Sequence, residues 1–480
     1  MKKYVLLYSA VIIIFGLGIY FTLAYGQHLA PPAGTSAIQT GLLDKSSPAP
    51  AVNSSSILSG IKGNLQEPLG RLILQLIVIV VAARLMGRLV GRIGQPAVVG
   101  EMIAGILLGP SLFGSLYPEV FNFVFPSSSL GPLKLISQIG VCLFMFIVGL
   151  EVNVGHLRHK AQTAVVVSHA SIVIPYFLGV TASLLFYAPL AGPGIPFMPF
   201  ALFLGISMSI TAFPVLARIL MDRRIEDTPL GTTSIACAAV DDATAWTILA
   251  FVVAIAKSTT VASSVLSLTL VVAFVLFMIF VIRPQLPRWF GVQTSSVKLT
   301  DGTLPAVLIF SFTSALATEI IGIHALFGAF LAGAIMPTEA KFREFLTIRL
   351  ENFSSTFLVP LFFAFTGLRT QIGLLDDAES WMYCAALIFI ATLGKLGSSM
   401  LAARFTGLNW IDSFSLGALM NTRGLMELIA INIGYDLGIL SPRIFAMLVI
   451  MALFTTFMTG PLLSLADLAR NRFAPATATR

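Results

Sequence analysis

The stretch VGEMIAGILLGP, residues 99–110, recurs in altered form as FGAFLAGAIMP at residues 327–337. In both copies the pattern Gly-x-x-x-Ala-Gly precedes an apolar run that ends in proline. The repeated glycines are Gly100, Gly105, Gly328 and Gly333. Small residues spaced in this way allow close packing between helices in membranes. The two copies therefore suggest an internal repeat in a helical membrane protein.

The composition of the whole chain agrees with this interpretation. Of 480 residues, 57% are hydrophobic and 11% are charged, whereas soluble domains contain about 25% charged residues. Apolar runs of about 17 to 25 residues, each long enough to cross a bilayer as a helix, recur from end to end. We therefore predict an all-α polytopic membrane protein with about thirteen transmembrane helices. The predicted spans are 72–89, 96–113, 133–152, 161–187, 199–221, 230–256, 261–282, 304–320, 323–336, 353–368, 381–403, 414–433 and 444–465.

The N-terminus carries a further apolar segment, MKKYVLLYSAVIIIFGLGIYFTLAYGQ. Its basic start and the small residues at its end are typical of a signal peptide, but its length also fits an uncleaved helix. We expect residues 1–26 to be one or the other. Residues 27–69 are rich in Pro, Ser, Gly and Ala and are expected to form a flexible extracytoplasmic linker. The transmembrane domain is then 70–467, followed by a short cytoplasmic tail, 468–480.

The basic residues predict the orientation. If the first span runs inward, most Lys and Arg residues fall at cytoplasmic ends, as the positive-inside rule requires. The C-terminus is then cytoplasmic, and we expect the protein to lie in the inner (plasma) membrane of a bacterium. The same bias accounts for the net charge of +7, so no nucleic-acid partner is expected.

The position of the repeat predicts its symmetry. The second copy lies in the seventh span after the first, so the two copies cross the membrane in opposite senses. This is the sequence signature of an inverted-topology repeat, whose halves are related by a pseudo-twofold axis in the membrane plane.

The fifth span of each half contains residues that interrupt a helix. One span includes SMSITAFPVLARIL, residues 207–220, with Pro214 after Thr211; the other includes LMNTRGLMELIAINIG, residues 419–434, with Gly424 after Asn421. Irregular backbone within a membrane is tolerated only beside protein or a water-filled cavity. We therefore predict two interrupted helices that cross in the protein interior, the alternative being a proline kink with an interhelical polar contact.

The sixth span contains two adjacent aspartates, Asp241 and Asp242, within IACAAVDDATAWTILAF, residues 235–251. A carboxylate at this depth is costly, and such residues usually mark ion or proton pathways. It either holds a proton or, when ionised, binds a cation, and a single carboxylate that cannot hold both is sufficient for exchange. A membrane lysine, Lys395, is available in the span 381–403. The alternative is a purely structural ion pair.

Eight motifs in order along the chain carry a resemblance to a known family. They are GQPAVVGEMIAGILLGPS, LFMFIVGLEV, SITAFPVLARIL, AAVDDATAW, GIHALFGAFLAGAIMP, LFFAFTGLRT, GKLG and NTRGLMELI. Together they resemble the monovalent cation:proton antiporter family 2. The resemblance implies that the second aspartate, Asp242, is the cation ligand and that Asp241 pairs with Lys395.

Several other polar residues lie within predicted spans. Thr211 could supply a hydroxyl or carbonyl oxygen to the cation, since hard cations prefer oxygen ligands. Arg423 and Glu427 are four residues apart, which fits either a structural ion pair or a gating role. We assign Asn421, in the same span, to the same candidate group. Arg369 lies at an outer helix end, where snorkelling to lipid headgroups would explain it.

These features predict a secondary antiporter that exchanges Na⁺ or K⁺ for protons by alternating access. The exchange cycle could be electrogenic. A gated cation channel or an ion-coupled symporter on the same fold is the alternative. An enzyme is disfavoured because no nucleophile with a base or metal triad is evident, and no cofactor is expected. The partners are then the cation, protons and the lipid bilayer. The resemblance and the close packing of small residues also imply a homodimer through spans 96–113 and 323–336.

Overall fold

The computed structural model describes residues 2–27, 29, 64–65, 67–151, 161–257, 261–293, 296–297 and 302–473. This part is nearly all helical, with one antiparallel pair of two-residue strands, β1 (Val292–Gln293) and β2 (Ser296–Val297). Eleven described segments are long and apolar enough to cross a membrane. Two shorter apolar helices and one interrupted pair occupy the other predicted spans. The prediction of an all-α membrane protein is confirmed.

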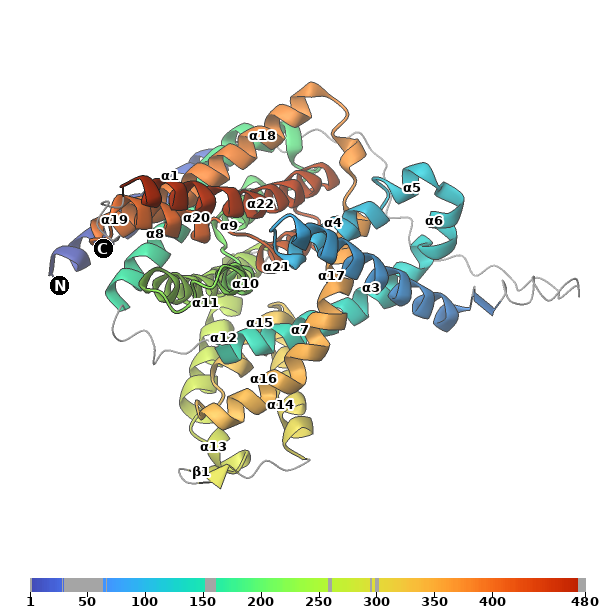
Figure 1. The fold of residues 1–480 in the computed structure, drawn as a ribbon, viewed down its shortest axis with the longest axis horizontal. Helices are drawn as coiled ribbons and strands as arrows, with labels where there is room; N and C mark the ends of the chain where they lie inside the picture. Colours follow the sequence, from blue (N-terminus) through green and yellow to red (C-terminus); the bar gives the residue numbers. More distant parts are fainter. Residues whose placement is uncertain are drawn as a thin grey trace, which may run out of the picture.

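Six helices form one bundle, which we name the scaffold bundle, and these come from the first three spans of each predicted half. They are α3 (Pro68–Arg92), α4 (Ala97–Leu108), α7 (Leu130–Glu151), α14 (Thr303–Ile321), α15 (Ala325–Ala334) and α17 (Val359–Arg369). In Figure 1, α14 lies low in the view, and α7 and α15 lie above it, near the centre.

The repeated glycines of α4 and α15 have equivalent neighbours in the scaffold bundle. A Cβ atom at Gly100 would overlap the backbone of α3, and one at Gly328 would overlap the backbone of α14. A Cβ atom at Gly105 would overlap α17, and one at Gly333 would overlap α7. Each glycine helix therefore packs on the preceding helix of its own half and on the third helix of the other half. This exchange of neighbours is what the predicted inverted repeat requires.

The same contacts correct the expected dimer interface. All four repeated glycines face other helices of the same chain at distances that exclude a side chain. These glycine surfaces of α4 and α15 are therefore covered within the monomer. A homodimer has to use other surfaces.

The remaining long helices form a second bundle, which we name the transport bundle. They are α8 (Ala161–Leu190), α9 (Phe197–Ser209), α10 (Phe213–Asp222), α11 (Pro229–Lys257), α18 (Ala378–Thr392), the π-helical turn η6 (Leu393–Gly397), α19 (Ser398–Phe405), α20 (Trp410–Met420), α21 (Leu425–Asp436) and α22 (Pro442–Phe473). In Figure 1, α18, α20 and α22 lie high in the view, and α11 lies between them and the helices of the scaffold.

The remaining helices and connections complete the fold. They are α5 (Phe113–Leu116), α6 (Pro118–Val124), η1 (Ser127–Ser129), α12 (Val261–Phe277), η3 (Met278–Ile282), α13 (Leu286–Trp289), α16 (Ala340–Phe353), η4 (Ser354–Leu358) and η5 (Ile372–Leu374). Side chains cap several long helices: Asp377 accepts a hydrogen bond from the Ser380 amide at the start of α18, and Asn409 accepts one from the Asp412 amide at the start of α20. These caps satisfy amide groups that the first helical turn leaves without partners.

The chain ends differ in detail from the predicted boundaries. Residues Lys2–Gly26 form helix α1, which packs on α8 through an edge-to-face contact between Phe15 and Phe177. Most of the predicted linker, residues 27–69, lies outside the described residues. Helix α3 begins at Pro68, so residues 68–69 of the predicted linker belong to the helix. Helix α22 continues to Phe473, beyond the predicted domain boundary at 467, and residues 474–480 lie outside the described part.

Candidate functional site

Both predicted helix interruptions are present, and they meet in the transport bundle. The chain leaves helical geometry between α9 and α10 and again between α20 and α21. The Ala212 amide donates a hydrogen bond to the Thr422 carbonyl at 3.0 Å, and the Thr211 hydroxyl donates to the Met420 carbonyl at 2.9 Å. The two interruptions therefore satisfy part of each other's backbone hydrogen bonding, which lipid cannot do.

The local sequence explains where each interrupted helix restarts. Pro214 occupies the first turn of α10, where its missing amide hydrogen costs nothing and its fixed φ suits the helix. Gly424 directly precedes α21, and a Cβ atom there would lie 2.9 Å from Val215. Proline and glycine thus stand at matching positions, one at the restart of each interrupted helix.

Asp241 lies beside this crossing in a buried ion pair with Lys395. The Lys395 Nζ atom is 3.2 Å from both carboxylate oxygens, and neither residue is exposed. The Ser171 hydroxyl donates to Asp241 Oδ1 at 2.5 Å, and the Thr211 amide donates to Oδ2 at 2.9 Å. Because an unpaired polar or charged group at this depth would be very costly, these donors stabilise the carboxylate in its buried position.

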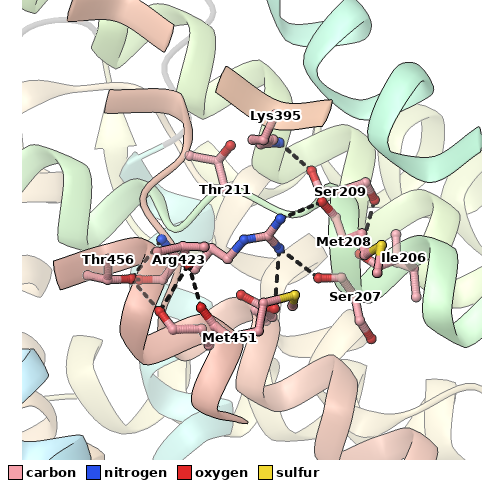
Figure 2. A network of polar contacts seen from close by, with 12 residues as sticks. Ile206, Ser207, Met208, Ser209, Thr211, Lys395, Arg423, Met451 and Thr456 are labelled. Atoms are coloured by element: carbon pink, nitrogen blue, oxygen red, sulfur yellow. Dashed lines mark hydrogen bonds and ion pairs between the residues drawn. The ribbon is translucent and has the colours of Figure 1, made fainter. Parts of the chain in front are cut away.

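Lys395 links three elements of the transport bundle through its ammonium group. It also donates to the Ser171 carbonyl of α8 at 3.0 Å and to the Ser209 carbonyl at the end of α9, as Figure 2 shows for Ser209. The lysine stands in the π-helical turn η6, between α18 and α19. Such turns often occur at functional positions in helices.

Asp242 has different surroundings, although it is almost as buried, with 1% of its surface exposed. Successive residues of an α-helix point about 100° apart, so the two aspartates cannot face the same groups. The contacts with Lys395 and Ser171 converge on Asp241. The structure therefore places one aspartate in the ion pair and a second buried carboxylate immediately beside it.

Arg423 joins the two interrupted helices. Its guanidinium donates to the carbonyls of Ser207 and Met208, each at 2.7 Å, near the C-terminal end of α9 (Figure 2). It also pairs with Glu427 at 3.2 Å, one turn away on α21. Carbonyls at a helix C-terminus lack intrahelical donors, and a cation there is favoured by the helix dipole. The predicted Arg423–Glu427 pair is present, and the arginine also caps α9.

Asn421 is a completely buried residue at the second interruption. Neither atom of its carboxamide has a hydrogen-bond partner among the described residues. The carbonyls of the adjoining residues Met420 and Thr422 accept the hydrogen bonds that connect this interruption to the one between α9 and α10. The crossing thus contains a carboxamide oxygen that accepts no hydrogen bond from the described residues.

Two polar contacts, one in the site and one away from it, were not predicted from the sequence. Ser171 was missed, although it lies among small polar residues in SHAS, residues 168–171, within an apolar span. Arg369 was expected to snorkel to headgroups, but its side chain is 15% exposed and pairs with Asp436 and Asn432 of α21. The expectation was wrong because α21 ends beside α17 and supplies closer partners than the headgroups.

Comparisons with known proteins agree with this architecture. Residues 77–466 match the family model described as "Sodium/hydrogen exchanger, transmembrane". The chain is 43% identical over 388 residues to the Na⁺/H⁺ antiporter NhaS4 of Synechocystis, covering 81% of this chain and 95% of that relative. The fold is also similar to the solved structure of the sodium proton antiporter MjNhaP1 of Methanocaldococcus jannaschii, with a TM-score of 0.58 at 13% identity, over 82% of this chain and 98% of the other.

Longer relatives share the same region. The chain is 38% identical to cation/H⁺ antiporter 17 of Arabidopsis thaliana and 33% identical to K⁺/H⁺ antiporter 1 of Saccharomyces cerevisiae, covering 83% and 85% of this chain. It spans about half of each of these proteins, 48% in both cases. The extent of the family match and the identity to NhaS4 show that the chain belongs to the sodium/hydrogen exchanger family.

Proposed function

We propose that this member of the family is an antiporter that exchanges a monovalent cation, Na⁺ or K⁺, for protons by alternating access, with Asp242 as the shared ligand. The observation that carries the proposal is the arrangement at the crossing. One buried aspartate is already neutralised by Lys395, and a second buried carboxylate lies next to it. A second carboxylate beside a buried ion pair can hold either a proton or a monovalent cation, but not both.

Oxygen ligands for the cation are available close to the interruptions. The carboxylate of Asp242, the carboxamide oxygen of Asn421 and a backbone or hydroxyl oxygen of Thr211 would together replace part of the hydration shell. Hard cations prefer such oxygen ligands. Because the interruptions free carbonyl groups from helical hydrogen bonding, the crossing can adjust its oxygen positions to the ion.

The Asp241–Lys395 pair supplies a second proton in this proposal. Its mutual attraction stabilises the site before the cation binds. When a cation enters at Asp242, the added positive charge favours release of the Lys395 proton, which gives two protons for each cation and an electrogenic cycle. A cycle in which only Asp242 titrates would be electroneutral, and the voltage response of transport distinguishes the two.

Alternating access requires one bundle to move against the other. The site lies wholly within the transport bundle, between α8, α9, α11, η6 and the α20–α21 interruption. The scaffold bundle is closely packed through its glycines and lacks comparable buried charge pairs among its described residues. We therefore assign the movement to the transport bundle. The C-terminus would face the cytoplasm of a bacterial cell, as the basic residues predict, and a homodimer would form through scaffold surfaces other than the glycine faces.

The test uses the purified protein in liposomes that contain a pH-sensitive dye. An inward Na⁺ or K⁺ gradient is imposed without a pH gradient, while the membrane potential is clamped at zero. An antiporter drives protons out and makes the lumen alkaline. A symporter would make it acidic, and a channel would create no lasting pH difference under the clamp. Either of the last two results would reject the proposal in favour of the alternative function.

A further inference from the structure

A second group of charged residues bridges the two bundles far from the aspartates. Asp436 stands at the end of α21, in the transport bundle, and its carboxylate pairs with two cations of the scaffold bundle. Lys134 of α7 lies 3.1 Å from Asp436 Oδ2, and Arg369 at the end of α17 pairs with Oδ1. One carboxylate of the transport bundle is therefore held by two separate scaffold helices.

Further contacts fix Arg369 in place. Its guanidinium donates to Asn432 Oδ1 at 3.0 Å and lies over the ring of Tyr435, with 4.3 Å between the guanidinium carbon and the ring centre. The Asn432 amide donates to the Thr366 hydroxyl of α17 at 2.9 Å. Polar and cation–π contacts of this kind are strongest when partly buried, as they are here. All of them join α17 to the last two turns of α21.

No described ion pair at the opposite end of the bundles makes an equivalent bridge. There, Arg223 pairs with Asp467, and Arg470 pairs with Asp412. These pairs connect the end of α10, the start of α20 and the end of α22, all within the transport bundle. In the described part of the chain, ion pairs therefore bridge the two bundles on one side only.

A small cavity lined by both polar and apolar residues lies at the bridged side. Its volume is about 30 Å³ in this closed arrangement. Its polar lining residues are Ser137, Gln138, His324, Arg369, Asn432 and Asp436. These come from α7, from α17 and the start of α15 in the scaffold bundle, and from α21 in the transport bundle. The cavity is therefore located on the boundary along which the bundles would separate.

Helix α21 connects this cavity to the aspartate site. The helix begins at Leu425, directly after the interruption at the crossing, and ends at Asp436. At 1.5 Å per residue this is about 17 Å. Ile429 and Ile433 line the cavity along the same helix. A widening of the boundary beside α21 would thus lead from Asp436 towards the crossing.

We propose that this cavity is the outer entrance for the monovalent cation, and that Lys134 and Arg369 close it by occupying the carboxylate of Asp436. The positively charged groups of Lys134 and Arg369 occupy the carboxylate oxygens of Asp436, which a hydrated cation could also approach. While they are bound, α21 is held against α7 and α17, and the entrance is shut. An arriving cation competes for the Asp436 oxygens and weakens the hold. This inference rests on the alternating access proposed above, but its test does not require transport.

The test measures how fast a cysteine in the entrance reacts with a membrane-impermeant maleimide added from outside. Ser137→Cys is introduced into a variant whose Cys142, Cys237 and Cys384 are replaced by serine. Ser137 is 1% exposed, so slow labelling is expected. Asp436→Asn removes both bridging ion pairs and should raise the labelling rate roughly fivefold or more, and Lys134→Gln should raise it less.

A matched control breaks an ion pair of the same kind that does not bridge the bundles. Arg443 pairs with Asp377 at 2.8 Å, within the transport bundle. Hydrogen bonds from Ser380, together with Arg443, keep the pKa of Asp377 below its ordinary value, so this pair remains charged under assay conditions. Arg443→Gln should leave the labelling rate of the cysteine unchanged.

The same measurements are repeated in the presence of Asp242→Asn, where the proposed exchange is absent. If Asp436→Asn raises the labelling rate in the Asp242→Asn protein as much as in the parent protein, the entrance is supported independently of the transport function. Equal labelling of the Asp436→Asn, Lys134→Gln and parent proteins would overturn the proposal. So would an equal increase with Arg443→Gln, or labelling from the cytoplasmic face alone.

Discussion

Two ion pairs at the crossing have the same burial and the same separation but different surroundings. Asp241–Lys395 and Arg423–Glu427 are each fully buried and 3.2 Å apart. The Asp241 carboxylate also accepts hydrogen bonds from a hydroxyl and a backbone amide. Neither Glu427 oxygen has a hydrogen-bond partner among the described residues, and its contact is the ion pair with Arg423. The first pair is held on both sides, because Lys395 also donates to two backbone carbonyls, and the second is held on the arginine side.

This difference indicates different roles for the two pairs. Arg423 is fixed by the carbonyls that end α9, and Glu427 balances its charge. That pair therefore keeps the two interrupted helices together. Lys395 instead faces a carboxylate that would keep two donors if the lysine lost its charge. Asp241 would therefore not be left wholly without partners if Lys395 lost its proton, as the proposed coupling role requires.

The largest expected effect on stability comes from Arg423→Ala. The change leaves Glu427 as a buried carboxylate without its cation and removes the cap from α9. Breaking a buried pair in this way costs about 3–5 kcal/mol. We expect a large fall in the yield of folded protein and in the unfolding temperature in detergent. An unfolding temperature near that of the native protein would show that Arg423 does not hold the crossing together.

Lys395→Gln should be milder, because the glutamine amide can still donate to Asp241, and Ser171 and Thr211 remain. We expect a loss of about 1–3 kcal/mol in stability. Exchange should persist, since the competition at Asp242 survives, but its response to an imposed membrane potential should fall. Each charge that crosses the full potential contributes about 2.3 kcal/mol per 100 mV. A variant with an undiminished voltage response would exclude Lys395 as the second proton carrier.

The smallest of these effects is expected for Ser171→Ala, which removes one donor from Asp241 and leaves the ion pair. The expected cost is about 1–2 kcal/mol, together with a change in the pH at which exchange is half-maximal. Ser183→Ala is the matched control, because Ser183 lies on the same helix and its hydroxyl donates only to the Val180 carbonyl one turn away. If both variants behave alike, Ser171 has no particular link to the site.

Much of the site could be predicted from the sequence because charge is rare in the apolar spans. The family resemblance implied that Asp241 pairs with a membrane lysine, and Lys395 lies well within a predicted span, where a buried carboxylate needs such a partner. Proline and glycine interrupt helices for known steric reasons, which identified both interruptions. The repeated glycine pattern similarly identified the halves of the fold.

Other contacts could not be predicted because they depend on which helices are neighbours. A serine such as Ser171 usually donates within its own helix, as Ser183 does, and the spacing of residues does not show that α8 passes beside Asp241. The bridge between Arg369 and Asp436 requires α17 and α21 to end at the same place. The glycine faces were assigned to a dimer because the sequence does not distinguish packing within a chain from packing between chains.

The central claim is that Asp242 binds the cation and the proton in turn, and replacing it by asparagine tests this most directly. Asp242→Asn removes the titrating proton and the anionic oxygen while keeping nearly the same shape. The matched control is Asp222→Asn, which changes a half-exposed aspartate at the end of α10. Both variants are reconstituted in dye-loaded liposomes, and cation-driven proton flux is measured at equal protein content. The account predicts that Asp242→Asn abolishes the flux and that Asp222→Asn retains it, whereas near-native flux in Asp242→Asn would contradict the assignment of the site.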